Sequence, residues 1–213
     1  MKKSLFTLAA GLMAISTAAF AGTTATNTNT VSPTLQVSAN IQKAVQLTLL
    51  TGTSTAAHCT VTPAGGAPDY TMNFGNVDAL GINAPTCGSV FAPATPGVSN
   101  AIYWSDYNLK PVFTSHATTN ASTITAYVST NFAGNNISMV RDSANSATVP
   151  GSAAAFTAMS TAVGAQDTLA SGAGITSGTA ITRFIGVSIA PTNGAGIGTG
   201  AQTATVTFTL TIN

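Results

Sequence analysis

The chain has 213 residues and very few charges: Lys and Arg number 6 and Asp and Glu number 5, for a net charge of +1. So few cations exclude a nucleic-acid-binding protein, which needs a basic surface to neutralise phosphates. All five acidic residues are Asp, and 45% of the chain is hydrophobic, which is enough for one domain with a substantial core.

The N-terminus has the pattern of a secretory signal peptide. Lys2 and Lys3 form a basic start, residues 5–18 are apolar or small, and residues 19–21 read A-F-A. This pattern predicts cleavage after Ala21 and export through the periplasm to the cell surface or beyond. No later stretch reaches about eighteen continuous apolar residues, so we expect no membrane-spanning helix in the mature chain. Its polarity comes from Thr, Ser, Asn and Gln, and abundant Thr favours strands.

Residues 22–43 are expected to form an N-terminal leader and a strand that can be donated to a neighbour. Residues 22–32 are polar, and strict apolar–polar alternation then runs from Thr34 to Leu49, interrupted by Lys43. Alternation of this kind predicts extended chain with one buried side. We expect two strands, Thr34–Gln42 and Ala44–Leu50. The first has four apolar positions on one face: Leu35, Val37, Ala39 and Ile41. It pairs either with a neighbouring subunit or within its own sheet.

Residues 44–213 are expected to fold as one antiparallel β-sandwich, because short alternating segments recur between turn signals. Predicted strands follow the second alternating segment at 70–74, 109–113, 122–129, 137–141, 181–189 and 204–212. Pro111 places the strand 109–113 at a sheet edge. The helical spacing of Phe156, Met159 and Val163 predicts one short helix. In the last strand Val206, Phe208, Leu210 and Ile212 alternate with Thr and form the expected edge of an acceptor groove.

Cys59 and Cys87 are the only cysteines. An even pair in an exported chain predicts a disulfide, which would stabilise the fold by about 3–4 kcal/mol in the chain-entropy model. The alternative is a reactive thiol pair, but the C-x-x-C spacing typical of such pairs is missing.

The runs Val45–Gly52, Cys59-Thr60-Val61 and Met72-Asn73-Phe74-Gly75, with the Thr-rich end 203–213, resemble spore coat U-type proteins and archaic chaperone–usher pilins. The resemblance implies an immunoglobulin-like sandwich that lacks its final strand. The N-terminal strand of the next subunit fills the gap and builds a fibre. It also implies that Leu35, Val37, Ala39 and Ile41 are donor residues, and that Cys59 matches the family's first cysteine. A periplasmic chaperone and an outer-membrane usher are the implied partners besides other copies of the chain.

Other chemistry has weaker support in the sequence. His58 and His116 have no nearby ligand partners, and no G-x-S-x-G motif is present, so we expect no metal, no cofactor and no enzyme activity. The aromatic group Tyr103, Trp104 and Tyr107 could form a sugar-stacking face or a core corner. Three functions therefore remain: a filament or coat subunit, a monomeric adhesin or carbohydrate-binding module, and a small outer-membrane β-barrel.

Overall fold

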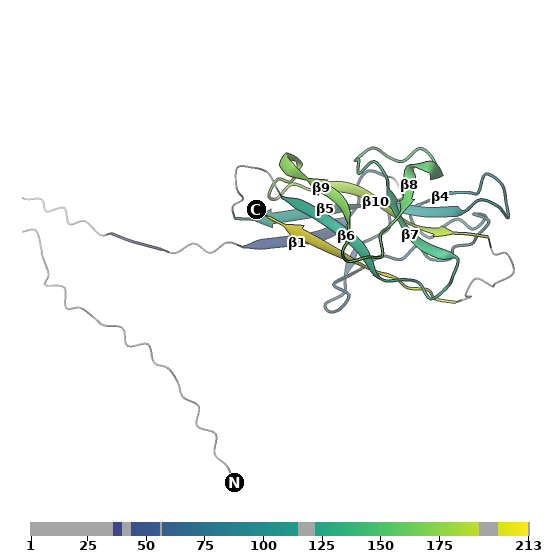
Figure 1. Cartoon of the computed structure of the whole chain (residues 1–213), viewed down its shortest axis with the longest axis horizontal. Coiled ribbons are helices and arrows are strands. Elements are labelled where there is room, and N and C mark those ends of the chain that lie inside the picture. Colours follow the sequence, from purple (N-terminus) through teal and green to yellow (C-terminus); the bar gives the residue numbers. More distant parts are fainter. Residues whose placement is uncertain (1–35, 40–43, 56, 115–121, 192–199, 213) are drawn as a thin grey trace, which may run out of the picture. The chain divides into compact units, whose positions relative to one another are not determined.

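The computed structural model describes residues 36–39, 44–55, 57–114, 122–191 and 200–212 (Figure 1). The chain divides into two compact units, Met1–Ile41 and Gln42–Asn213. In the first unit, residues 36–39 belong to no strand and their side chains are exposed. The second unit contains all the described strands, so the fold is that of residues 42–213.

The larger sheet of the second unit has six strands in the order β1-β5-β10-β7-β8, and β4 also pairs with β5. All of its pairings are antiparallel. Its strands are β1 (Val45–Thr51), β4 (Ser89–Phe91), β5 (Ala101–Phe113), β7 (Ile137–Asp142), β8 (Phe156–Ala158) and β10 (Ile181–Ile189). β1 pairs with the second half of β5, where Val45 lies opposite Phe113 and Thr51 opposite Tyr107.

The second sheet has three strands in the order β11-β6-β9 and is also antiparallel. It consists of β6 (Thr123–Thr130), β9 (Asp167–Ser171) and β11 (Thr205–Thr211), and a separate ribbon pairs β2 (Thr62–Pro63) with β3 (Tyr70–Thr71). Two short 3-10 turns, η1 (Ala153–Ala155) and η2 (Gly172–Gly174), precede β8 and follow β9. The described chain is therefore an all-β antiparallel sandwich, as the alternating sequence predicts.

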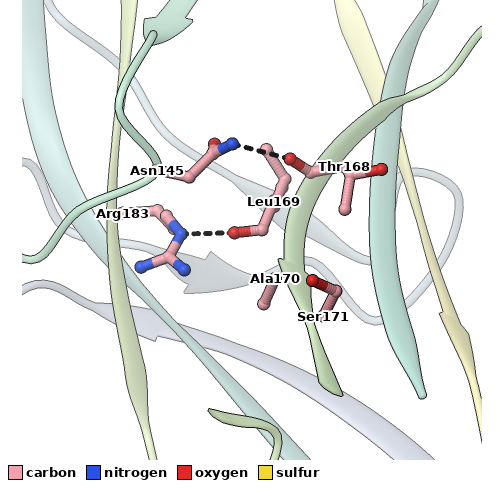
Figure 2. Close-up of a pocket in the computed structure, with 6 residues that line it drawn as sticks. All are labelled: Asn145, Thr168, Leu169, Ala170, Ser171 and Arg183. Carbon is pink, nitrogen blue, oxygen red and sulfur yellow. Dashed lines mark hydrogen bonds between the residues drawn. The ribbon is translucent and has the colours of Figure 1, made fainter. Parts of the chain in front are cut away.

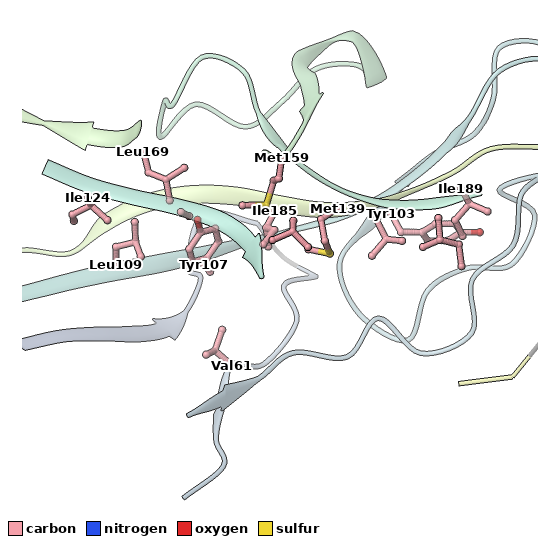
Figure 3. Close-up of a cluster of buried hydrophobic side chains, with 14 of the residues drawn as sticks. Val61, Tyr103, Tyr107, Leu109, Ile124, Met139, Met159, Leu169, Ile185 and Ile189 are labelled. Carbon is pink, nitrogen blue, oxygen red and sulfur yellow. The ribbon is translucent and has the colours of Figure 1, made fainter. Parts of the chain in front are cut away.

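The main core lies between the two sheets and draws on both (Figure 3). Tyr103, Leu109 and Ile124 are fully buried in it, and Leu169 of β9 is 1% exposed. A second, smaller cluster covers the opposite face of the six-stranded sheet, where Trp104 stacks on the ring of Phe91 at 5.5 Å. Because both of its faces are covered, the middle of this sheet carries apolar side chains on successive residues rather than on alternate ones.

β5 corrects the predicted length of the strand at 109–113, because it has 13 residues. It pairs with β10 only as far as Leu109, so the segment around Pro111 pairs with β1 alone, which agrees with the predicted edge position. Pro111 is tolerated because its carbonyl accepts a hydrogen bond from the Gly178 N–H, on the side away from β1. In an antiparallel strand the N–H of a residue points to the same side as its carbonyl. The missing N–H of Pro111 therefore costs no hydrogen bond in the β1 ladder.

The predicted short helix is also wrong. Phe156 begins strand β8, Met159 lies just beyond the end of that strand, and Val163 lies in the connection to β9. Phe156 packs on the outer cluster, Met159 is buried in the main core, and Val163 is 68% exposed. The three side chains have three different environments, so their helical spacing does not reflect a shared face. Among the described residues, no helix is long and apolar enough to cross a membrane.

Candidate functional site

The candidate site is the open edge, by which we mean the side of the sandwich formed by β1 and β11. Each of these strands ends its sheet: β1 pairs only with β5, and β11 pairs only with β6. The two strands lie next to each other (Figure 1), yet no β-ladder joins them. Both lie wholly within the described residues, so each presents one row of backbone donors and acceptors that no described strand pairs with.

The open edge carries no charged side chain. β1 reads V-Q-L-T-L-L-T and β11 reads T-V-T-F-T-L-T. Exposed edge strands in soluble proteins usually carry Lys, Pro or a bulge that discourages pairing with another chain. The open edge has no charge and no Pro, and the register shift of β11, between Thr205 and Val206, lies at the start of that strand. The rest of the edge is therefore suited to accept a further strand.

The apolar side chains of the open edge are only partly buried, although they pack against the main core. The members of this set are Leu47, Leu49, Val206, Phe208, Leu210 and Ile212. Phe208 meets the buried Tyr107 ring edge-to-face, with the centroids 5.8 Å apart. The sequence predicts the last four residues as the groove edge, and the structure places them in one half-buried row. Covering that row would remove more apolar surface from water.

A carboxylate next to the aromatic group, whose structural role the sequence did not predict, holds the end of β1 in place. Asp106 is fully buried, and its side chain accepts hydrogen bonds from the Ser54 N–H at 2.6 Å and the Thr55 hydroxyl at 2.6 Å. A Cβ on Gly52 would collide with the carboxyl group and backbone of Asp106, so glycine is required there. The Thr-Gly turn is therefore needed because the chain passes directly over this carboxylate.

The disulfide between Cys59 and Cys87 is formed, which confirms its prediction, and the sulfurs are 2.08 Å apart. The Cys59 N–H donates to the Ser105 hydroxyl on β5 at 2.8 Å. The neighbouring Val61 N–H donates to the Thr51 hydroxyl at the end of β1 at 2.9 Å. The disulfide segment thus ties the end of β1 to the sheet, and its role in the described chain is structural.

The predicted donor residues fall in the first unit. Val37 and Ala39 are exposed, and Val37 is 81% exposed. Leu35 and Ile41 lie outside the described residues.

The aromatic group belongs to the core, which is one of the two alternatives that its sequence left open. Tyr103 is fully buried, Trp104 is 4% exposed and Tyr107 is 2% exposed. Tyr103 and Tyr107 point into the main core, while Trp104 points into the outer cluster. Burial, together with the nearby Asp142 carboxylate, raises the pKa of Tyr107 well above its usual value. A sugar ring cannot reach the faces of these aromatic rings. The three side chains are core residues.

A small polar hollow of about 260 Å³ lies at the opposite side of the sandwich, beside β9 (Figure 2). Arg183 lines it and donates from Nε to the Leu169 carbonyl at 2.7 Å, and Asn145 donates to the Thr168 carbonyl at 2.8 Å. Burial lowers the pKa of Arg183, an effect partly offset by Asp142 and Tyr107. The Arg183 and Asn145 side chains thus bind backbone carbonyls of β9 and hold neighbouring segments together. The hollow that they line does not resemble a catalytic centre. No group of three or more metal-ligating side chains occurs in the part of the chain that the structure describes.

No protein-family model, curated protein or solved structure matches this chain. The open edge is therefore the feature from which a function can be inferred.

Proposed function

We propose that the protein is a structural subunit of an extracellular filament or coat. In this assembly, residues 34–42 of one copy add as a strand to the free edge of β11 in the next copy. The observation that carries the proposal is the uncharged open edge, whose apolar side chains are left half-buried by the subunit's own described strands. Strand addition supplies a backbone hydrogen-bond ladder and apolar contacts together.

The donor and acceptor sequences are complementary in spacing. Alternate residues of an extended strand lie roughly 6.5–7 Å apart on one face. The four apolar donor residues, Leu35 to Ile41, can therefore lie beside the four apolar acceptor residues, Val206 to Ile212. Burial of four such side chains contributes on the order of 6–10 kcal/mol before the cost of ordering the strand. A contact of this size is durable when a full hydrogen-bond ladder accompanies it.

The signal-peptide pattern supports an assembly outside the cytoplasm. During export the open edge would be exposed to other copies, and it has no charges to prevent premature pairing. A periplasmic chaperone that covers the edge, and an outer-membrane usher that exchanges it for the donor strand, would meet this need. The proposal includes both as partners.

The test uses the chain from residue 22, with size-exclusion chromatography and negative-stain microscopy. Val37→Asp and Ile41→Asp each place a charge in the donor row, and we expect folded monomers where the parent chain forms ladders or filaments. Ser38→Asp is the matched control, because position 38 lies on the other face of the donor strand and the variant should still assemble. Normal assembly of Val37→Asp, or a parent chain that stays monomeric, would contradict the proposal.

A further inference from the structure

The connection between the donor strand and the sandwich is short, and this limits where the donating subunit can sit. Ile41 is the last apolar donor residue, and β1 begins at Val45. The three residue steps from Ile41 to Ala44 span at most about 11 Å even when fully extended. If Ile41 occupies a neighbour's groove, the sandwich of the donor must therefore touch the neighbour at the end of that groove.

The sandwich has two ends, which we tell apart by the strands that begin and end at each. At the near end β1 begins and β5 and β11 end, since Val45 lies opposite Phe113 and β11 ends opposite the start of β6. At the far end β5 begins and β10 ends, with Ala101 opposite Ile189. β11 also begins at the far end, because its first residue pairs with the last residue of β6, and only residues 131–136 separate β6 from β7.

The direction of the donor strand decides which end receives the donor's sandwich. Every described strand pair in this chain is antiparallel, and antiparallel ladders are slightly more stable per residue than parallel ones. A donor antiparallel to β11 runs from the near end to the far end. Its last residues, and the sandwich that follows them, then lie at the far end of the acceptor.

The far end carries a loop that the fold holds in a defined shape. The Asp78 carboxylate accepts hydrogen bonds from the backbone N–H groups of Leu80 at 2.7 Å and Asn83 at 2.7 Å, and from that of Ile82 at 3.3 Å. The hydroxyl of the buried Tyr103, the third residue of β5, bonds the Asp78 N–H at 3.1 Å. Desolvation raises the pKa of Asp78, but these backbone donors outweigh it and hold that pKa below its usual value.

This held loop presents aliphatic side chains to solvent. Leu80 is 46% exposed and Ile82 is 77% exposed. Gly81 lies against Ala92 and Pro93, which begin the connection from β4 to β5 at this end of the sandwich. Val98, further along the same connection, is 75% exposed. We call Leu80, Ile82 and Val98 the far-end patch. At the near end, Val45 is 53% exposed and Val112 is 40% exposed.

We propose that the far-end patch is the second contact between successive subunits, and that it receives the near end of the copy that donates its strand. The inference rests on the proposed function and adds the surface and the orientation. The contact is head-to-tail, between two different surfaces of the same chain. A contact of this kind builds an open filament, or a ring where the rotation closes, instead of a two-fold dimer.

The test measures assembly and strand binding separately. Ile82→Lys and Val98→Lys place a charge in the far-end patch, and we expect each to raise the protein concentration needed for half-assembly by about tenfold or more. Val163→Lys is the matched control, because Val163 is 68% exposed and belongs to the connection between β8 and β9 instead of the far-end patch. A synthetic peptide of residues 34–42, added to chains that lack these residues, should bind the far-end variants as tightly as the parent.

The outcomes separate the two proposals. Unchanged assembly of Ile82→Lys and Val98→Lys, with the peptide still bound, would overturn the far-end contact and leave strand addition in place. Weakened assembly of Val163→Lys to the same degree would also overturn it, because the effect would then follow surface charge in general. A parent chain that neither assembles nor binds the peptide would overturn both.

Discussion

The two edges of the sandwich differ in their charge and in their backbone hydrogen bonding. At the open edge, β1 and β11 lie side by side without a ladder and have no charged residue. At the closed edge, by which we mean the side formed by β8 and β9, the chain crosses between the sheets. Met159 N–H donates to the Met139 carbonyl at 3.0 Å, and the Ser160 carbonyl accepts from the Val128 N–H at 2.8 Å. Two neighbouring residues thus bond both sheets.

Charge reinforces the closed edge. Arg141 on β7 forms an ion pair with Asp167 on β9 at 2.9 Å, and the side chains are 15% and 14% exposed. The other carboxylate oxygen of Asp167 accepts from the Ser160 N–H at 2.7 Å. A chain with so few charges therefore places an ion pair where its own sheets meet and none on β1 or β11. The closed edge is therefore completed by the subunit's own chain, whereas no described strand completes the open edge.

The largest expected effect on stability is at the closed edge. Asp167→Asn breaks the ion pair and weakens the acceptor of the Ser160 N–H, so we expect a loss of about 2–3 kcal/mol in the free energy of unfolding by urea. Asp69→Asn makes the same charge change at an exposed position and should have no measurable effect. Because the open edge is untouched, the folded fraction of Asp167→Asn should still bind the 34–42 peptide. Loss of peptide binding without unfolding would show that the two edges are not independent.

An intermediate effect on stability is expected at the Gly52 turn, which holds the end of β1 against Asp106. Gly52→Ala drives a methyl group into the Asp106 carboxylate, so the turn must shift, at a cost of roughly 1–3 kcal/mol. Gly66→Ala is the control, because a Cβ at that exposed glycine meets no atom within 4 Å. Thermal unfolding of both variants measures the difference. Equal melting temperatures would mean that Asp106 does not fix the open edge.

The smallest effect on stability is expected on the outer face of β11. Thr209 is exposed, so Thr209→Lys should change the free energy of unfolding by less than about 0.5 kcal/mol. The same change adds the kind of charge that protects edge strands in other proteins, and we expect shorter or fewer assemblies by electron microscopy. Thr62→Lys, on an exposed Thr of the β2–β3 ribbon, is the control. Assembly unaffected by Thr209→Lys would argue against β11 as the acceptor.

Sequence reasoning worked for two kinds of strand. The alternating C-terminal segment contains all of β11. The apolar run 181–189 coincides with β10, although β10 has buried side chains on both faces. Sequence reasoning failed for β5, where Trp104 and Tyr103 point to opposite covered faces, so alternation does not mark the strand. The helical spacing of Phe156, Met159 and Val163 led to the wrong prediction of a helix. Spacing alone does not show which neighbours each side chain contacts. Nothing in the sequence around Asp106 revealed that its carboxylate holds a turn some fifty residues earlier.

The class of the fold, the disulfide and the apolar row of the last strand could be predicted from the residues alone, because alternation is local and the two cysteines can be counted. Three further features needed the folded chain: β1 and β11 lie together as an open edge, the aromatic group is buried, and Arg141 and Asp167 meet across the closed edge. These features depend on which strands become neighbours. That choice is made by packing the whole set of strands around one core, and no single segment encodes it.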